Sequence, residues 1–321
     1  MNSAVSFHDN HPASTDGSIY DELLEGLTAT PKWVSPKFFY DRRGSELFDQ
    51  ICQQPEYYPT RTEEGILKDW AGDIARAVGP DATLIELGSG VSRKIRLLLE
   101  ALHPASYVGI DISRDFLLDS TRQLADDYPW LEVHAACADF SRPVTLPQSV
   151  VGPHPVAFFP GSSIGNFSPD DARDFLLGLG TLLPEGSGLL VGVDLIKPRP
   201  ILDAAYNDAA GFTAAFNLNL LMRLRDEFGA DVDPARFSHQ AFYNEAQSRI
   251  EMHLVSRCDQ TMTLAGHSVT FAAGETLHTE SSYKYSVEGF QQLANEAGFV
   301  SRALWTDPDN LFSLHYLERE V

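Results

Sequence analysis

The residues best suited to chemistry lie where two apolar, strand-like segments end. The first segment, within "LIELGSGVSRK", runs into Gly88, Ser89 and Gly90 and then into a helical pattern. Glycines at the end of a strand let bare backbone N–H groups come close to a ligand. Asp111 lies at the end of the next apolar segment, in "GIDIS". A carboxylate there can accept hydrogen bonds from both hydroxyls of a ribose, which indicates a nucleoside-containing cofactor.

A third segment, "LEVHAACADF", adds Asp139 and Phe140 at its end. The carboxylate can receive an adenine amino group, and the ring can shield the base. Each residue alone could serve only as a turn or a cap, but their order on successive strands resembles class I S-adenosylmethionine-dependent methyltransferases. A nicotinamide-dependent oxidoreductase is disfavoured, because Arg93 occupies the place of the third glycine of a dinucleotide site.

A fourth apolar segment ends in the small-residue loop of "FFPGSSIGNFSP". In an open α/β sheet this loop faces the ligand crevice. The Asn166 amide has donors and an acceptor, so it could bind both ends of a zwitterion. The sequence leaves equally open that Asn166 only caps the helix that starts near Pro169.

The elements that position these residues alternate between helix and strand from Thr62 onward, which is typical of a doubly wound α/β sheet. One helix is expected over 62–78, with Thr62 as its N-cap. Five buried strands are expected within 83–90, 106–113, 131–140, 155–167 and 188–196. The segments 301–308 and 311–319 are predicted to form an antiparallel hairpin at the edge of this sheet.

After residue 200 the pattern changes to a long helical region, broken at Gly211, and then to apolar positions with a period of two. This predicts a second, smaller α+β domain that binds substrate. We expect a disordered tail over 1–17, the substrate-binding domain over 18–61 and 197–283, and the methyltransferase domain over 62–196 and 284–321.

The composition excludes several classes of partner. A net charge of −21, from 24 basic and 45 acidic residues, would repel both nucleic acid and anionic lipid. The chain has no signal-like start, no long apolar run, and three isolated cysteines, which predicts a cytoplasmic protein. Without a coiled coil or an apolar surface helix, we expect a monomer. The ten histidines show no ligand spacing, so no metal site is predicted.

Longer motifs extend the resemblance. "KFFYDRRGSELFDQI", "PEYYPTRTE", "ELGSGVSRK", "GSSIGNF", "AYNDAAGFTAAFN", "RIEMHL", "FAAGETLHTESSYKY" and "WTDP" together resemble the histidine-specific methyltransferases of ergothioneine biosynthesis, from about Tyr20 to the end. The resemblance implies a Rossmann-like class I methyltransferase fold with a separate substrate-binding domain. It also implies that S-adenosylmethionine trimethylates the α-amino group of L-histidine to give hercynine.

The resemblance further implies roles for individual residues. The cofactor-binding positions are Gly88, Lys94, Asp111, Asp139 and Phe140. The positions that hold the carboxylate and amino end of histidine are Asn166 and Tyr206. Those around the imidazole are Tyr57, Glu280 and Ser282, with Met252 in the pocket wall. Tyr40 matches a tyrosine near the reacting amine, and Gly161 offers its backbone carbonyl there.

Two alternatives follow from the same residues. A methyltransferase of another amino acid, such as tryptophan or tyrosine, would share the cofactor positions and differ only around the imidazole. A binding module without activity is disfavoured, because Tyr40, Asn166 and Tyr206 are all present. Of the adjacent tyrosines, Tyr57 is expected to face the imidazole and Tyr58 to pack, and Pro59 disfavours helix at Tyr58.

Overall fold

The computed structural model describes residues 5–9, 16–90, 92–142 and 144–320, and the chain divides into two compact units. The first unit comprises Met1–His11, Pro59–Ile196 and Lys284–Val321, and the second comprises Pro12–Tyr58 and Lys197–Tyr283. The first unit thus includes residues 59–61, which the sequence assigns to the other domain. Each unit has its own sheet and is described by itself.

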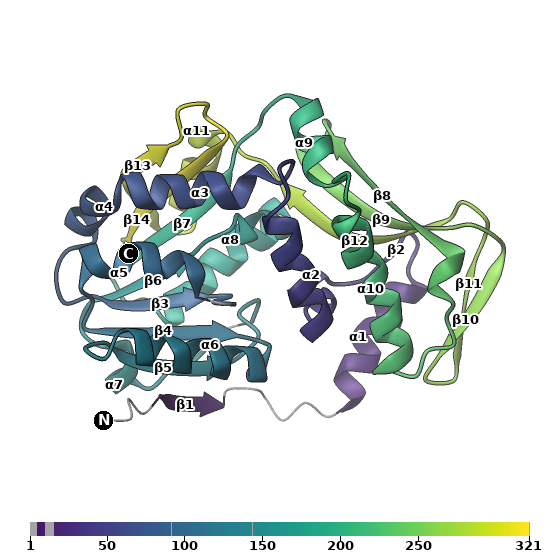
Figure 1. Cartoon of the computed structure of the whole chain (residues 1–321), viewed down its shortest axis with the longest axis horizontal. Helices are drawn as coiled ribbons and strands as arrows, with labels where there is room; N and C mark the ends of the chain where they lie inside the picture. The colour runs from purple at the N-terminus through teal and green to yellow at the C-terminus, as the bar shows by residue number, and fades with distance from the viewer. Residues whose placement is uncertain (1–4, 10–15, 91, 143, 321) are drawn as a thin grey trace. The chain divides into compact units, whose positions relative to one another are not determined.

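The first unit is built on an eight-stranded sheet in the order β1-β5-β4-β3-β6-β7-β14-β13 (Figure 1). The strands are β1 (Ser6–Asp9), β3 (Thr83–Leu87), β4 (Ser106–Asp111), β5 (Glu132–Cys137), β6 (Pro155–Phe159), β7 (Gly188–Asp194), β13 (Phe299–Thr306) and β14 (Phe312–Arg319). All run in the same direction except β14, which pairs antiparallel with both β7 and β13 and forms with β13 the edge hairpin expected from the sequence. The strand order reverses between β3 and β6, the point where open α/β sheets bind ligands.

Helices cover both faces of this sheet, which explains why its central strands β3, β6 and β7 are buried throughout (Figure 1). In β7 every residue is buried. The helices are α3 (Tyr58–Asp69), α4 (Ala71–Val78), α5 (Arg93–Leu102), α6 (Arg114–Asp127), α7 (Gln148–Val151), α8 (Pro169–Gly178) and α11 (Val287–Glu296), with short 3₁₀ turns η2 (Ser163–Asn166) and η3 (Leu179–Thr181). The α4 helix packs against α5, and α11 against α8. The prediction of a doubly wound α/β fold is confirmed.

The N-terminal segment differs from the expected disordered tail. Residues Ser6–Asp9 form β1, which pairs with β5 in parallel, and the guanidinium of Arg114 lies 4.8 Å from the centre of the Phe7 ring. Because main-chain pairing and this contact fix the segment, the expectation of disorder over 1–17 is wrong for Ser6–Asp9 and for the start of α1 at Asp16. The rest of the expected tail, 1–4 and 10–15, lies outside the described residues.

The helix expected over 62–78 is also different. It begins at Tyr58 rather than at Thr62, and it is interrupted at Trp70, so α3 and α4 are separate. Thr62 therefore lies inside α3 and does not cap it. Pro59 stands in the first turn, where a helix needs no N–H, so it allows Tyr58 to start the helix and the prediction that it would not is wrong.

The second unit contains a four-stranded sheet in the order β2-β12-β9-β8 and a separate hairpin of β10 and β11. The strands are β2 (Lys32–Trp33), β8 (Phe237–Asn244), β9 (Arg249–Ser256), β10 (Gln260–Leu264), β11 (His267–Phe271) and β12 (Thr276–Tyr283). The helices are α1 (Asp16–Thr28), α2 (Arg42–Cys52), α9 (Arg199–Ala205) and α10 (Phe212–Asp226), with 3₁₀ turns η1 (Pro36–Phe39) and η4 (Pro234–Arg236). The α+β texture predicted for this part is present.

The long helix α10 covers one face of the four-stranded sheet by packing on β8 and β9. Gly211 adopts a positive φ of 78° at its N-cap, as expected for the break in the helical pattern. The Asp208 carboxylate accepts the backbone N–H groups of Phe212 (2.8 Å) and Thr213 (2.7 Å). These bonds satisfy donors that the first turn of a helix leaves open, so α10 is firmly anchored at this end.

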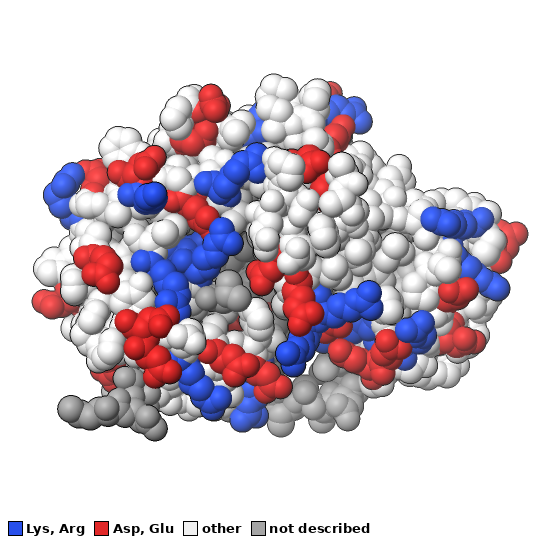
Figure 2. Space-filling view, viewed as in Figure 1, with Lys and Arg blue, Asp and Glu red and all other residues white. Residues whose placement is uncertain are grey.

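Charged side chains of both signs are spread over the surface (Figure 2). On the face shown, Lys and Arg side chains lie among Asp and Glu side chains, in keeping with the many ion pairs between neighbouring residues. Among the described residues, no helix combines the length and the apolar character that crossing a membrane requires.

Candidate active site

The loop between β3 and α5 has the backbone geometry that its glycines predict. Gly88 and Gly90 have positive φ angles of 70° and 49°. The N–H of Gly90 donates to Asp111 Oδ2 (3.0 Å), and the N–H of Ser113 donates to Asp111 Oδ1 (2.9 Å). Burial raises the pKa of Asp111, while these backbone bonds act to lower it. The carboxylate is thus held in one orientation, and its remaining lone-pair capacity can accept from a ligand.

Gly88 has no side chain, and this leaves room for the ring of Phe140. A Cβ there would lie only 3.2 Å from Cε1 of Phe140. The Phe140 ring also packs edge to face on Phe159, with centroids 5.5 Å apart. Next to it, Asp139 Oδ1 accepts the N–H of Ser141 (3.0 Å). The structure therefore brings the predicted Gly88, Asp139 and Phe140 together at the ends of β3 and β5.

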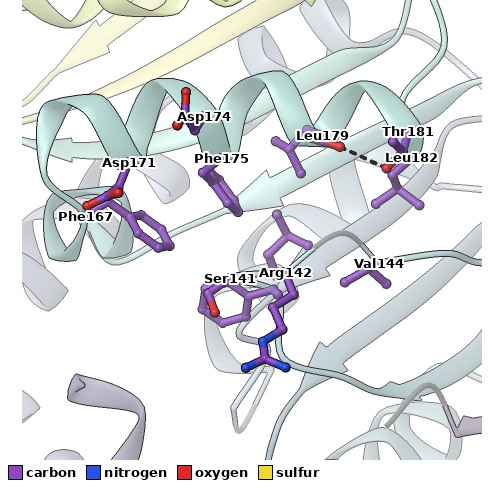
Figure 3. A pocket seen from close by; sticks show the side chains of 13 residues that line it. Ser141, Arg142, Val144, Phe167, Asp171, Asp174, Phe175, Leu179, Thr181 and Leu182 are labelled. Atoms are coloured by element: carbon purple, nitrogen blue, oxygen red, sulfur yellow. Dashed lines mark hydrogen bonds between the residues drawn. The ribbon is translucent and has the colours of Figure 1, made fainter. Parts of the chain in front are cut away.

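A cavity of about 310 Å³ opens beside Phe140. Figure 3 shows Phe167, just before α8, and Phe175, on α8, facing the segment after β5 that carries Ser141 and Arg142. The cavity thus has an aromatic wall and a polar rim, the general character of sites for small organic ligands.

Glu63, which the sequence analysis missed, links two predicted site residues. Its side chain is fully buried, and its Oε2 lies 2.6 Å from Nζ of Lys94. Both carboxylate oxygens also accept the N–H of Gly161, at 3.0 and 2.9 Å. The carboxylate on α3 therefore fixes the first turn of α5 and the loop after β6. Glu63 is the last residue of "PEYYPTRTE", a motif quoted for the family resemblance, and this position was the signal that could have marked it as a site residue.

Asn166 ends the 3₁₀ turn η2 and is partly exposed. The helix that follows, α8, is capped by Ser168, whose Oγ accepts the N–H of Asp171 (3.2 Å). The alternative that Asn166 caps this helix is therefore wrong. The loop is also tied to β7, because the N–H of Asp194 donates to Oγ of Ser162 (2.9 Å). This anchoring holds the backbone that carries Asn166 at the carboxyl end of β6.

In the second unit, Tyr57 is the centre of a buried group of predicted site residues. Its pKa is raised well above the usual value by burial first, and then by Tyr206, Cys52, Glu280 and Tyr40. The phenol therefore stays protonated and can donate a hydrogen bond. Sequence analysis had placed Tyr40, Tyr57, Tyr206 and Glu280 in one pocket, and in the structure Tyr40, Tyr206 and Glu280 each act on the pKa of Tyr57.

Aromatic rings that the sequence analysis did not single out complete this group. The Phe48 ring lies 6.0 Å from Tyr40 and 6.1 Å from Tyr57, between centroids. The Phe216 ring, on α10, lies 5.8 Å from Tyr40. Tyr57 and Tyr206 meet edge to face, with centroids 6.1 Å apart. The tyrosine hydroxyls are thus carried on an aromatic framework from α2 and α10, which restricts their motion.

Tyr206 and Ser282 contact each other directly. The Tyr206 hydroxyl donates to Ser282 Oγ (2.9 Å), and both residues are buried. The backbone carbonyl of Tyr206 lies 3.0 Å from Nε2 of His239 on β8. These bonds connect the end of α9 to two strands, so the phenol is held in a fixed position.

A β-bulge in β12 decides which side chains face this group. His278 lies opposite His253 on β9, but the register then shifts, so that Glu280 lies opposite Met252. Residues directly opposite in a sheet share a face. Without the extra residue, Glu280 would share a face with His278, since side chains alternate along a strand. The bulge therefore places Glu280 beside Met252.

The predicted site residues are divided between the two units. The first unit holds Gly88, Lys94, Asp111, Asp139, Phe140, Gly161 and Asn166, all at the carboxyl ends of strands or in the loops and helix starts that follow them. The second unit holds Tyr40, Tyr57, Tyr206, Met252, Glu280 and Ser282.

Comparison with known proteins identifies the family of the chain. A family model described as "Histidine-specific methyltransferase, SAM-dependent" matches residues 19–319. A histidine N-alpha-methyltransferase from Mycolicibacterium smegmatis is 43% identical over 300 residues, covering 91% of this chain and 92% of the relative. Ergothioneine biosynthesis protein 1 from Neurospora crassa is 30% identical, and the match covers 90% of this chain but 33% of that protein.

A more distant relative acts on a different amino acid. The 4-dimethylallyltryptophan N-methyltransferase from Claviceps purpurea is 27% identical over 329 residues, covering 94% of each chain. Since the family model spans nearly the whole chain and the M. smegmatis relative matches over most of its length, the protein belongs to the family of histidine-specific, S-adenosylmethionine-dependent methyltransferases.

Proposed function

We propose that this enzyme transfers three methyl groups from S-adenosylmethionine to the α-amino nitrogen of L-histidine, forming hercynine for ergothioneine biosynthesis. The observation that carries the proposal is the bulged strand β12, which turns Glu280 to the Met252 side of the sheet. There Glu280 helps to raise the pKa of Tyr57, whose ring lies beside that of Tyr206. The names of the M. smegmatis and N. crassa relatives support the substrate and the pathway.

For the cofactor we propose Gly88, Lys94, Asp111, Asp139 and Phe140. Asp111 accepts the ribose hydroxyls through the lone pairs that Gly90 and Ser113 leave open. Asp139 accepts the adenine amino group, and Phe140 covers the base. Lys94, whose ammonium is oriented by Glu63, supplies positive charge for the carboxylate of the methionine part.

For histidine we propose that Tyr57, Glu280 and Ser282 surround the imidazole and that Met252 forms the wall. The Glu280 carboxylate accepts one ring N–H, and the Ser282 hydroxyl bonds the other nitrogen. A site that bonds both ring nitrogens rejects analogues that lack one of them, because a buried polar group would be left without a partner. Asn166 and Tyr206 hold the carboxylate and amino end.

The reaction needs alignment more than acid or base strength. In each step the amine lone pair forms the new N–C bond while the S–CH₃ bond breaks. The sulfur keeps the electron pair of that bond, so the rest of the cofactor leaves as a neutral thioether. Holding the two reactants in line can contribute about 7–11 kcal/mol in favourable cases. The ammonium must lose a proton before each attack, so three protons leave in all. We propose that Tyr40 or an ordered water receives them, and that the Gly161 carbonyl favours their departure by accepting a hydrogen bond from the amine.

The test is to incubate the purified enzyme with S-adenosylmethionine and each of the twenty amino acids, and to look by mass for one, two and three added methyls. We expect trimethylation of histidine alone. No trimethylated histidine would refute the proposal. The main alternative, methylation of another amino acid, is favoured by the tryptophan-derived substrate in the name of the C. purpurea relative, and methylated tryptophan would support it.

We also infer that the enzyme acts as a cytoplasmic monomer that engages neither nucleic acid nor membrane and needs no metal for methyl transfer. The net charge of −21 and the three cysteines, none of which forms a disulfide, support this view. Light scattering on the purified protein should give the mass of one chain. Full activity after treatment with a chelator would agree with metal-independent transfer, whereas lost activity restored by a metal would contradict it.

A further inference from the structure

The second unit contains a cluster of metal-ligand side chains outside the proposed histidine pocket. Glu251 and His253 are two residues apart on β9, so their side chains leave the same face of the sheet. His278 on β12 lies directly opposite His253. One potential ligand atom from each of the three residues lies within 4.8 Å of the other two. Because of the bulge after His278, this face is opposite to the one that carries Glu280 and Met252.

We propose that Glu251, His253 and His278 bind one divalent transition-metal ion of the Zn²⁺ type. Two ligands at positions i and i+2 of one strand, with a third from the neighbouring strand, converge on a single point above the sheet. Imidazole nitrogens and a carboxylate oxygen are donors that Zn²⁺ accepts, and three protein ligands leave a fourth position for water.

The spacing of the closest pair already suits a shared ion. His253 Nε2 and Glu251 Oε2 are 3.0 Å apart. Two atoms that each bind Zn²⁺ at about 2.0–2.1 Å in tetrahedral geometry are separated by roughly 3.3 Å. An ion could therefore replace the proton between them with a shift of a few tenths of an ångström. The third donor atom, from His278, lies within 4.8 Å of these two atoms.

Neighbouring groups hold the carboxylate in the required orientation. Glu251 Oε1 accepts from Arg249 Nε and from Asn244 Nδ2, both at 2.9 Å. The other oxygen, Oε2, faces His253. Such outer contacts commonly orient the ligands of protein metal sites.

The two imidazoles are also held in place. Their rings stack with centroids 4.7 Å apart and an interplanar angle of 17°, and His253 stacks on Phe242 on its other side. Nδ1 of His253 is buried and has no hydrogen-bond partner among the residues described. His278 Nε2 lies 2.9 Å from the carbonyl of Glu280, and donation to this carbonyl leaves Nδ1 with its lone pair. The stacking therefore keeps both rings close together on the face that carries Glu251.

A bound ion would also act on the proposed substrate pocket. His278 immediately precedes the bulge and contacts the backbone of Glu280. Fixing His278 would therefore fix the strand segment that presents Glu280. This consequence rests on the proposed function, whereas the metal site itself does not.

The experiment is a titration of untagged, chelator-treated full-length protein with Zn²⁺ against a chromogenic chelator, and with Co²⁺ followed by visible absorption. We expect one ion per chain and an intense tetrahedral Co²⁺ spectrum. His278→Ala and Glu251→Gln should each weaken binding at least tenfold. His267→Ala, on the exposed turn side of β11, is the matched control and should leave binding unchanged.

Three results would overturn the proposal. They are no saturable binding near one equivalent, equal binding by wild type and His278→Ala, or an equal loss in His267→Ala. The milder His278→Asn and a thermal melt of each variant separate loss of ligand from loss of fold. Histidine affinity measured with and without Zn²⁺ then tests the coupling separately. Zn²⁺ binding without histidine binding would leave the metal site intact and refute only the proposed function.

Discussion

Replacing Glu63 with glutamine should test how the two loops at the switch point of the sheet are held. The substitution removes the charge and keeps the shape. Shape matters here, because a Cβ on Gly192 would lie only 2.0 Å from Glu63 Oε1, which shows how tightly β7 packs on this carboxylate. The amide oxygen of glutamine can still accept the N–H of Gly161, but its NH₂ group cannot accept from Lys94.

The expected loss follows from burial. Glu63 is 0% exposed and Lys94 is 17% exposed, with Nζ 2.6 Å from Oε2. Removing one partner of a buried ion pair costs about 3–5 kcal/mol, and the partial exposure of Lys94 favours the lower end. At about 2–4 °C per kcal/mol, this corresponds to a fall in Tm of about 6–20 °C.

Glu64→Gln is a control on the same helix. Glu64 pairs with Arg93 at 2.6 Å, but Arg93 is 52% exposed, so the loss should be at most about 1 kcal/mol. Thermal and urea unfolding of both variants give the comparison. In the neutral double variant Glu63→Gln/Lys94→Met, the loss should be smaller than the sum of the two single losses. Equal losses for Glu63→Gln and Glu64→Gln would refute the reasoning.

Three further predictions concern the proposed pockets and pH. Glu280→Gln should raise the Kd for histidine by about 10–100-fold, because a charge-assisted hydrogen bond contributes about 1.5–3 kcal/mol. Calorimetry should find the Kd for S-adenosylmethionine unchanged. Equal losses of affinity for both ligands would indicate misfolding. Tyr206→Phe should lower the free energy of unfolding by about 1 kcal/mol, because the hydrogen bond to Ser282 is lost. It should also raise the KM for histidine. An unchanged KM would argue against a role of Tyr206 in substrate binding. Burial raises the pKa of Glu86 to about 8, so the folded state keeps a proton that the unfolded state releases above its ordinary pKa of 4.5. Stability should therefore fall as pH rises from about 4.5 to 8, and urea unfolding should show no such fall in Glu86→Gln.

The sequence alone was sufficient for the elements whose cause is local. Five parallel strands were predictable because each is a short apolar run followed by a helical pattern, and Gly88, Asp111 and Asp139 were predictable because each follows such a run. The helix boundary at Tyr58 was not, because Pro59 is compatible with a first turn as well as with a break. The strand Ser6–Asp9 was missed, since a polar segment becomes a strand only when β5 offers it an edge.

Only the tertiary structure decided which side chains meet. The sequence around Glu63 does not indicate that its carboxylate binds both Lys94 and Gly161, because the three residues lie on three separate parts of the chain, α3, α5 and the loop after β6. The face on which Glu280 lies depends on one extra residue in β12, and an alternating pattern cannot reveal a bulge. The histidines likewise showed no ligand spacing along the chain, since His253 and His278 become neighbours only through the antiparallel pairing of β9 and β12. Local propensity determined the elements, and long-range pairing determined the sites.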